Sequence, residues 1–149
     1  MFACSVGLGA IHIFNFYTGE CPQSMVCKGH VHKVRCIDWF EDDFGFASCD
    51  MSGSTYFYDL QLQRETGMRN QDKDFNQRTI QFTGVCNVPK KPYEVLVVGS
   101  DQKVWHVNIN NSSATDEVKV GVQLSQVNIL KSGKYFFTGV GQDGRPGAI

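Results

Sequence analysis

Residues 29–60 read GHVHKVRCIDWFEDDFGFASCDMSGSTYFYDL, and this stretch decides the fold class. It contains three runs rich in β-branched and aromatic residues, Val34–Phe40, Phe44–Cys49 and Thr55–Leu60, which are separated by acidic, glycine and serine clusters. Short apolar runs bounded by turn residues are typical of β-strands, and no helical periodicity competes with this pattern. We therefore expect consecutive strands that are joined by hairpins.

Apolar strands that end in small residues recur along the chain, at Phe2–Gly7, Phe46–Asp50, Val97–Asp101 and Phe137–Gly139. The last three lead into turns that carry an aspartate. These landmarks repeat at roughly 40 to 50 residues, which is the length of one four-stranded propeller blade. The sequence therefore predicts an all-β fold, a partial β-propeller of about two to three four-stranded blades.

The repeat divides the chain into four segments. We interpret residues 1–28 as the end of an incomplete blade and residues 29–81 as a blade with an enlarged loop. Residues 82–120 then form a degenerate blade, and residues 121–149 start a further, truncated blade. On this interpretation the propeller is cut at both ends.

The enlarged loop is expected at residues 61–81, which are polar, charged and low in apolar content. Because long exposed loops often carry binding residues, we expect a protein partner to contact this segment. The candidate contact residues are its charged side chains, Arg64, Glu65, Arg69, Asp72, Lys73 and Asp74.

Composition excludes several classes of function. The 149 residues carry 14 basic and 15 acidic side chains for a net charge of −1, without a basic stripe, so nucleic acid is not an expected ligand. No apolar run approaches the roughly 18 to 20 residues of a membrane-spanning helix, so no membrane contact is expected. The six cysteines form no C-x-x-C pair, which favours buried thiols in a reducing compartment and a soluble intracellular protein.

Residues 29–60 resemble the WD-repeat family of β-propellers, whose repeat begins with Gly-His and closes with Trp-Asp. Here Gly29-His30 matches the opening pair and Tyr58-Asp59 is similar to the closing pair. The resemblance implies a buried network in which Asp50 orients His30, His30 bonds Ser48, and Ser48 bonds Tyr58. Such a network satisfies buried polar groups and stabilises the repeat, so its expected role is structural.

Two features depart from the WD-repeat pattern. Tyrosine replaces the usual tryptophan at residue 58, and the turn after Asp50 contains two more residues than the commonest form. In the following repeat, only Ser100 and Asp101 keep the pattern. The network is therefore expected to be most complete in the segment 29–81.

Three constellations suggest chemistry, but each has a simpler explanation. Cys27, His30, His32 and Cys36 have the residue types of a zinc site, yet the resemblance already explains Gly29-His30 and both cysteines fall in predicted strands. Residues 139–144 match G-x-G-x-x-G, but Arg145-Pro146-Gly147 predicts a turn instead of a helix. Asp50, His30 and Ser48 have the types of a hydrolytic triad, but the serine lacks a glycine elbow. We expect no catalytic residue, no cofactor and no metal, and hence no enzyme.

The stretch Phe2–Gly99 is further similar to axonemal WD-repeat proteins of cilia and flagella. The elements that carry this similarity include Lys28-Gly29-His30, Lys33–Trp39, Arg64-Glu65-Thr66 and Val98–Asp101. The similarity implies a scaffold of the motile axoneme on doublet microtubules that supports inner dynein arm assembly or regulation. It also implies inner-arm dynein subunits and other axonemal proteins as partners, and oligomerisation through coiled coil outside these residues. The alternative is a WD-repeat scaffold of a non-ciliary intracellular complex located in the cytoplasm.

Overall fold

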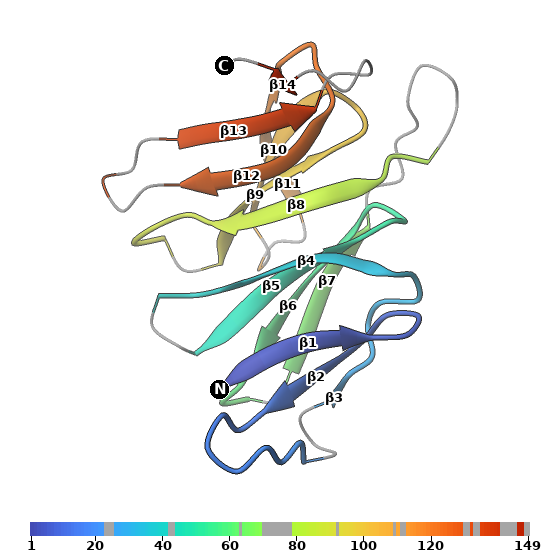
Figure 1. Ribbon diagram of the computed structural model, residues 1–149. Helices are drawn as coiled ribbons and strands as arrows, with labels where there is room; N and C mark the ends of the chain where they lie inside the picture. Colours follow the sequence, from blue (N-terminus) through green and yellow to red (C-terminus); the bar gives the residue numbers. More distant parts are fainter. Residues whose placement is uncertain are drawn as a thin grey trace.

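The computed structural model of the chain describes residues 1–22, 26–41, 44–62, 64–69, 79–91, 93–108, 110, 113–129, 132, 135–140 and 146–147. These residues form fourteen strands in four antiparallel sheets, and none of them lies in a helix (Figure 1). Among the described residues there is no helix that is long and apolar enough to cross a lipid bilayer. The expected all-β fold is confirmed.

Each sheet is a meander in which strands that follow one another in the chain pair side by side. The first sheet contains β1 (Phe2–Val6), β2 (Ala10–Phe14) and β3 (Val26–Cys27). The second contains β4 (Val34–Trp39), β5 (Gly45–Asp50), β6 (Ser54–Asp59) and β7 (Arg64–Arg69). The third contains β8 (Phe82–Asn87), β9 (Glu94–Gly99), β10 (Lys103–Asn108) and β11 (Ser113–Lys119). The fourth contains β12 (Leu124–Ile129), β13 (Tyr135–Val140) and β14 (Pro146–Gly147).

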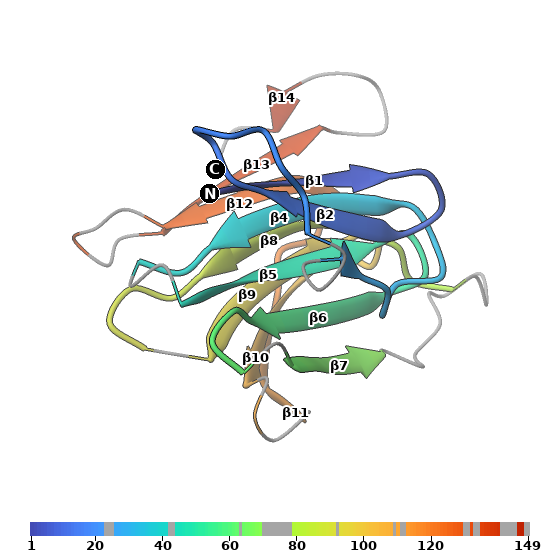
Figure 2. The ribbon, with the colours of Figure 1, turned by 90° about the horizontal axis from the view of Figure 1, so that it is seen from below.

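The four sheets stack face to face in the order in which they occur in the chain (Figure 1). The first strands of successive sheets are neighbours, because β4 contacts β8 and β8 contacts β12. The last strands, β7 and β11, lie at the opposite side of the molecule (Figure 2). This is the arrangement of consecutive propeller blades, with one set of strands inside and another at the rim.

Alternation along β5 sends side chains to both neighbouring sheets. Phe46 packs with Tyr58 against the first sheet, and Ala47 and Cys49 pack with Phe57 against the third. All six residues of β5 are buried, since this strand is covered on both faces. A strand of this kind can fold only between two other layers, because both of its faces must leave water.

The third sheet repeats this two-sided burial. Val97 and Val95 of β9 face the second sheet together with Trp105, while Leu96 and Val98 face the fourth. The apolar clusters on the two faces of each sheet therefore join the sheets into a continuous stack.

One sequence-based expectation about the fold is wrong. Residues 64–69 were expected in a loop, but they form β7, which pairs with β6 from Asp59↔Arg64 to Ser54↔Arg69. Strand pairing uses backbone hydrogen bonds and does not require apolar side chains, and charged residues are common on the outer strand of a sheet. Arg64, Glu65 and Arg69 are therefore strand residues, whereas the other three proposed contacts, Asp72, Lys73 and Asp74, lie outside the described residues.

The apolar interface between the second and third sheets, here called the seam, allows us to predict the effect of a core substitution. Phe82 is 0% exposed and lies in the cluster that joins these sheets. Phe82→Ala removes a buried ring and leaves a cavity, so we expect the free energy of unfolding to fall by about 3 to 5 kcal/mol. Urea unfolding followed by tryptophan fluorescence measures this change.

The matched control is Val118→Ala, because Val118 is 60% exposed. It should change the free energy of unfolding by less than about 0.5 kcal/mol. If both substitutions lowered the free energy of unfolding by similar amounts, the seam would not be the main source of stability.

Candidate functional site

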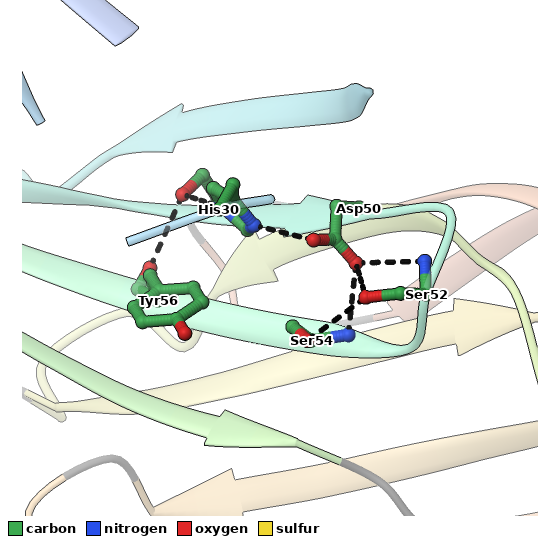
Figure 3. A network of polar contacts seen from close by, with 6 residues as sticks. His30, Asp50, Ser52, Ser54 and Tyr56 are labelled. Carbon is green, nitrogen blue, oxygen red and sulfur yellow. Dashed lines mark hydrogen bonds and ion pairs between the residues drawn. The ribbon is translucent and has the colours of Figure 1, made fainter. Parts of the chain in front are cut away.

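His30 is the centre of a buried polar network between the first two sheets (Figure 3). It lies in the connection from β3 to β4 and is only 5% exposed. Its Nδ1–H donates to Asp50 Oδ2 at 2.8 Å, and its Nε2 lies 2.8 Å from Ser48 Oγ. In the neutral imidazole, Nε2 is then the acceptor for the Ser48 hydroxyl. The structure therefore brings together three residues that the sequence singled out.

The second oxygen of Asp50 organises the turn between β5 and β6. Oδ1 accepts hydrogen bonds from the Ser52 N–H at 2.8 Å, the Ser52 hydroxyl at 2.8 Å and the Ser54 N–H at 3.0 Å. Gly53 completes this turn with a φ of 76°, which is strained for other residues. The lengthened turn that departs from the family pattern thus supplies the donors for a buried carboxylate.

Burial and hydrogen bonding act in opposite directions on Asp50. Burial by itself raises the pKa of the carboxyl, but the hydrogen bonds from His30, Ser52 and Ser54 outweigh it and hold the pKa below its ordinary value of 3.8. The negative charge of Asp50 is therefore stabilised inside the protein.

The structure corrects the aromatic member of the network, which is Tyr56 and not the expected Tyr58. Ser48 pairs directly with Tyr56 across the hairpin, and its Oγ lies 3.4 Å from the Tyr56 carbonyl oxygen. The Tyr56 and His30 rings are 4.6 Å apart in an edge-to-face arrangement. Tyr58 lies opposite Phe46, where the two rings stack 5.7 Å apart. Strand register decides between the two tyrosines, because only directly opposite residues are in close contact.

Two glycines leave room for the Tyr56 ring. A Cβ atom on Gly29 would lie 2.6 Å from Tyr56 Cε1, and a Cβ atom on Gly67 of β7 would overlap the same atom. Glycine is therefore required at both positions if the ring is to remain beside His30. This gives the Gly29-His30 pair a physical explanation.

The other proposed network residues make separate contacts. Asp59 Oδ1 accepts from the backbone N–H groups of Gln61 and Leu62 at 2.8 and 2.9 Å, which closes the turn after β6. Ser100 Oγ accepts from the Gln81 N–H at 3.1 Å, next to a backbone bond from the Ser100 N–H to the Gln81 carbonyl. Asp59 therefore fixes a local turn, whereas Ser100 extends the pairing of β8 with β9.

Asp101 holds the third sheet's indole ring in place. Its Oδ2 accepts from Trp105 Nε1–H at 2.6 Å within the β9–β10 hairpin. Burial raises the pKa of Asp101, although the bond from Trp105 partly opposes this rise. Asp50 ends β5 and Asp101 follows β9, the corresponding strand of the third sheet, but their pKa shifts have opposite signs.

A second set of hydrogen bonds joins the second and third sheets, and the sequence did not predict it. Asp38 Oδ2 accepts from both the backbone N–H and the Nδ2–H of Asn87 at 2.8 Å, and Asn87 Nδ2 also donates to the Trp39 carbonyl at 2.7 Å. Burial raises the pKa of Asp38, with opposing hydrogen bonds from Asn87 and Cys86. The only sequence signal was an aspartate inside an apolar strand.

The geometry of the His30 network favours a structural role. Ser48 is 1% exposed and Asp50 is 0% exposed, so a substrate cannot reach either side chain. Within the described ranges, no three His, Cys, Asp or Glu residues are grouped so that they could hold a metal ion. The arrangement pins the loop before β4 to the β5–β6 hairpin.

Comparison with known proteins shows similarity to one group of proteins. The chain is 31% identical over 146 residues to cilia- and flagella-associated protein 57 C of Tetrahymena thermophila, an alignment that covers 93% of the chain and 11% of that protein. It is 27% identical over 183 aligned residues to protein 57 A of the same organism, covering 99% and 14%. It is 27% identical over 136 residues to cilia- and flagella-associated protein 57 of Mus musculus, covering 91% and 10%. The chain thus spans roughly a tenth of the length of these relatives, and no protein-family model matches it.

The contact between Gly67 and the Tyr56 ring predicts that the effects of substitutions at these two positions are coupled. Gly67→Ala places a methyl group against the Tyr56 ring, so we expect the free energy of unfolding to fall by about 1 to 3 kcal/mol. In a Tyr56→Ala background the same change should cost much less, because the ring is gone. A double-mutant cycle by urea unfolding measures the coupling, and additive losses would contradict the proposed overlap.

The opposite pKa shifts of Asp50 and Asp101 predict opposite effects of pH. The folded pKa of Asp50 lies below 3.8, so its stabilising charge is fully present above about pH 4 and is lost as the pH falls through the folded pKa. The folded pKa of Asp101 lies above 3.8, so its stabilising contribution is present below about pH 4 and is lost as the pH rises through the folded pKa.

We therefore expect the stability difference between wild type and Asp50→Asn to shrink as the pH falls below about 4. The difference between wild type and Asp101→Asn should move against wild type as the pH rises above about 4. Urea unfolding of the three proteins across this range measures both trends. If both stability differences changed in the same direction with pH, the opposite pKa shifts of the two aspartates would be refuted.

Proposed function

Because the chain is homologous to a segment of the cilia- and flagella-associated protein 57 proteins, we propose that it is part of a structural scaffold of the motile ciliary axoneme. In this proposal, it is a WD-repeat propeller segment of a protein on doublet microtubules that supports inner dynein arm assembly or regulation. The observation that carries the proposal is 31% identity along 93% of the chain with a protein named for cilia and flagella.

The structure supports a role in binding and not in catalysis. The triad-like residues His30, Ser48 and Asp50 are all buried and bonded to one another. Their hydrogen bonds hold loops against strands, which gives the blade a rigid surface. Rigid stacked sheets are suited to presenting side chains to protein partners, as in other propellers.

The outer strand β7 is the surface that we propose for contact with inner-arm dynein subunits or neighbouring axonemal proteins. It is the last strand of the second sheet, and among the described residues no strand pairs with its outer edge. An outer strand presents backbone N–H and C=O groups that an extended segment of a partner can pair with. Arg64, Glu65 and Arg69 are the charged residues of this strand.

The proposal is tested by tagging the full-length protein in a ciliated cell and isolating demembranated axonemes. Crosslinking and mass spectrometry then identify the proteins in contact with β7. We expect the tagged protein to remain with the doublet microtubules and to crosslink to inner-arm dynein or its neighbours. Arg64→Ala combined with Arg69→Ala should reduce these crosslinks, whereas Lys119→Ala on β11, the corresponding outer strand of the third sheet, should not.

Recovery of the protein in the soluble fraction of the cell body, crosslinked to other partners, would refute the axonemal role. The alternative, a WD-repeat interaction scaffold of a non-ciliary intracellular complex, would then be the function to pursue. Retention in the axoneme without any contact to inner-arm dynein or its neighbours would remove the finer assignment and leave the ciliary scaffold.

A further inference from the structure

A cavity of about 370 Å³ lies where the first strands of three sheets end. Its volume is within the range of about 300 to 1,000 Å³ that is typical of ligand sites. Residues from the ends of β4, β8 and β12 and from the segments that follow β4 and β8 line it, among them Asp38, Trp39, Phe40, Phe44, Asn87 and Asn128. The cavity therefore belongs to the stack of sheets and to none of them alone.

The polar part of this cavity carries Asp38, which no cation of the described residues neutralises. Both hydrogen bonds to Asp38 Oδ2 come from the neutral Asn87, and within the described residues no lysine, arginine or histidine forms an ion pair with Asp38. Asp50 differs, because hydrogen bonds from His30, Ser52 and Ser54 reach both of its oxygens. A partly buried carboxylate without a counter-charge is costly, and a bound cation would offset that cost.

Asn87 holds this carboxylate in place. The residue is 9% exposed, and its Nδ2 donates to Asp38 and to the Trp39 carbonyl. Its Oδ1 accepts no hydrogen bond within the described residues, but this atom is fully buried, so a ligand in the cavity does not reach it. The acceptor that the cavity offers is therefore the Asp38 carboxylate.

The aromatic part of the lining favours a planar cation. Phe44 is partly exposed, lines the cavity and stacks on the buried Phe40 with the ring centres 5.0 Å apart. The Trp39 indole packs instead on Phe46, towards the first sheet. A guanidinium group is planar, stacks on aromatic rings and presents five donors, whereas an ammonium group is a compact, strongly hydrated charge. Arginine thus matches both the carboxylate and the aromatic ring.

Charges at the cavity's other lining positions do not prevent this. Lys91 is already paired with Glu94 at 3.1 Å, so its charge is compensated. Lys90 and Glu41 are exposed and of opposite sign, and water and salt screen exposed charges strongly. Asp38 is the more buried charge, so it dominates the interaction with a group that enters the cavity.

We propose that this cavity binds an arginine side chain of a partner protein, with Asp38 as the acceptor and Phe44 as the aromatic wall. The inference rests on the proposed function as a protein-binding scaffold, and it adds the chemistry of one contact. It concerns a different surface from β7, so the two can be tested separately.

The test uses purified full-length protein and a short peptide that carries one arginine beside a photoreactive benzoylphenylalanine. After irradiation, mass spectrometry should find the peptide attached within residues 38–44 or 86–91. A citrulline peptide, which has the same shape without the charge, should label these segments about tenfold less or lower still. Asp38→Asn should reduce labelling by the arginine peptide to a similar degree, and Glu20→Gln, at an exposed position outside the cavity, should leave it nearly unchanged.

Equal labelling by the arginine and citrulline peptides would overturn the proposal, and this comparison uses wild-type protein alone, so it does not depend on folding of the variant. Equal labelling by a lysine peptide would overturn the preference for guanidinium. If the protein stays in the axoneme but the arginine and citrulline peptides label it equally, only the proposal for the cavity is refuted. If the arginine peptide labels it preferentially but the protein is not found in the axoneme, only the ciliary role is refuted.

Discussion

Burial of both faces of the central strands is the constraint on which the rest of the structure depends. All six residues of β5 and five of the six in β9 are buried, with side chains directed alternately to two neighbouring sheets. Such strands lose their main source of stability if either neighbour is removed, because the hydrophobic effect scales with the apolar area taken from water. Face-to-face stacking of the sheets is therefore a condition of folding for each of them.

The apolar interfaces between sheets determine how polar residues are used. A polar group that is buried at such an interface is costly unless a neighbouring group forms a hydrogen bond with it. His30, Ser48 and Asp50 meet this requirement within the second sheet and the loop before it, and Asp38 and Asn87 meet it across the next seam. Within the described residues, both oxygens of Asp50 are hydrogen-bonded, whereas Asn87 Oδ1 accepts no hydrogen bond and no cation forms an ion pair with Asp38. That difference separates a structural network from a potential binding site.

Rigidity links these interactions to function. The His30 network holds a connecting loop, a hairpin turn and, through Tyr56 and Gly67, the outer strand β7. A protein surface that is fixed in this way binds with less loss of conformational freedom than a flexible one. The homology to cilia- and flagella-associated proteins and the buried state of the reactive side chains both fit a protein that positions other proteins.

Sequence by itself determined the strands of residues 29–60 and the repeat, because these follow from alternation and turn residues. The resemblance of this stretch to the WD-repeat family indicated His30, Ser48 and Asp50 as members of one network. Tertiary structure decided which tyrosine joins the network, since hairpin register places Tyr56 opposite Ser48. It also revealed β7, whose pairing uses backbone atoms that leave no side-chain signature, and the contact between Asp38 and Asn87, which are 49 residues apart. Contacts across a seam depend on how separate sheets dock, and local sequence patterns carry no record of that docking.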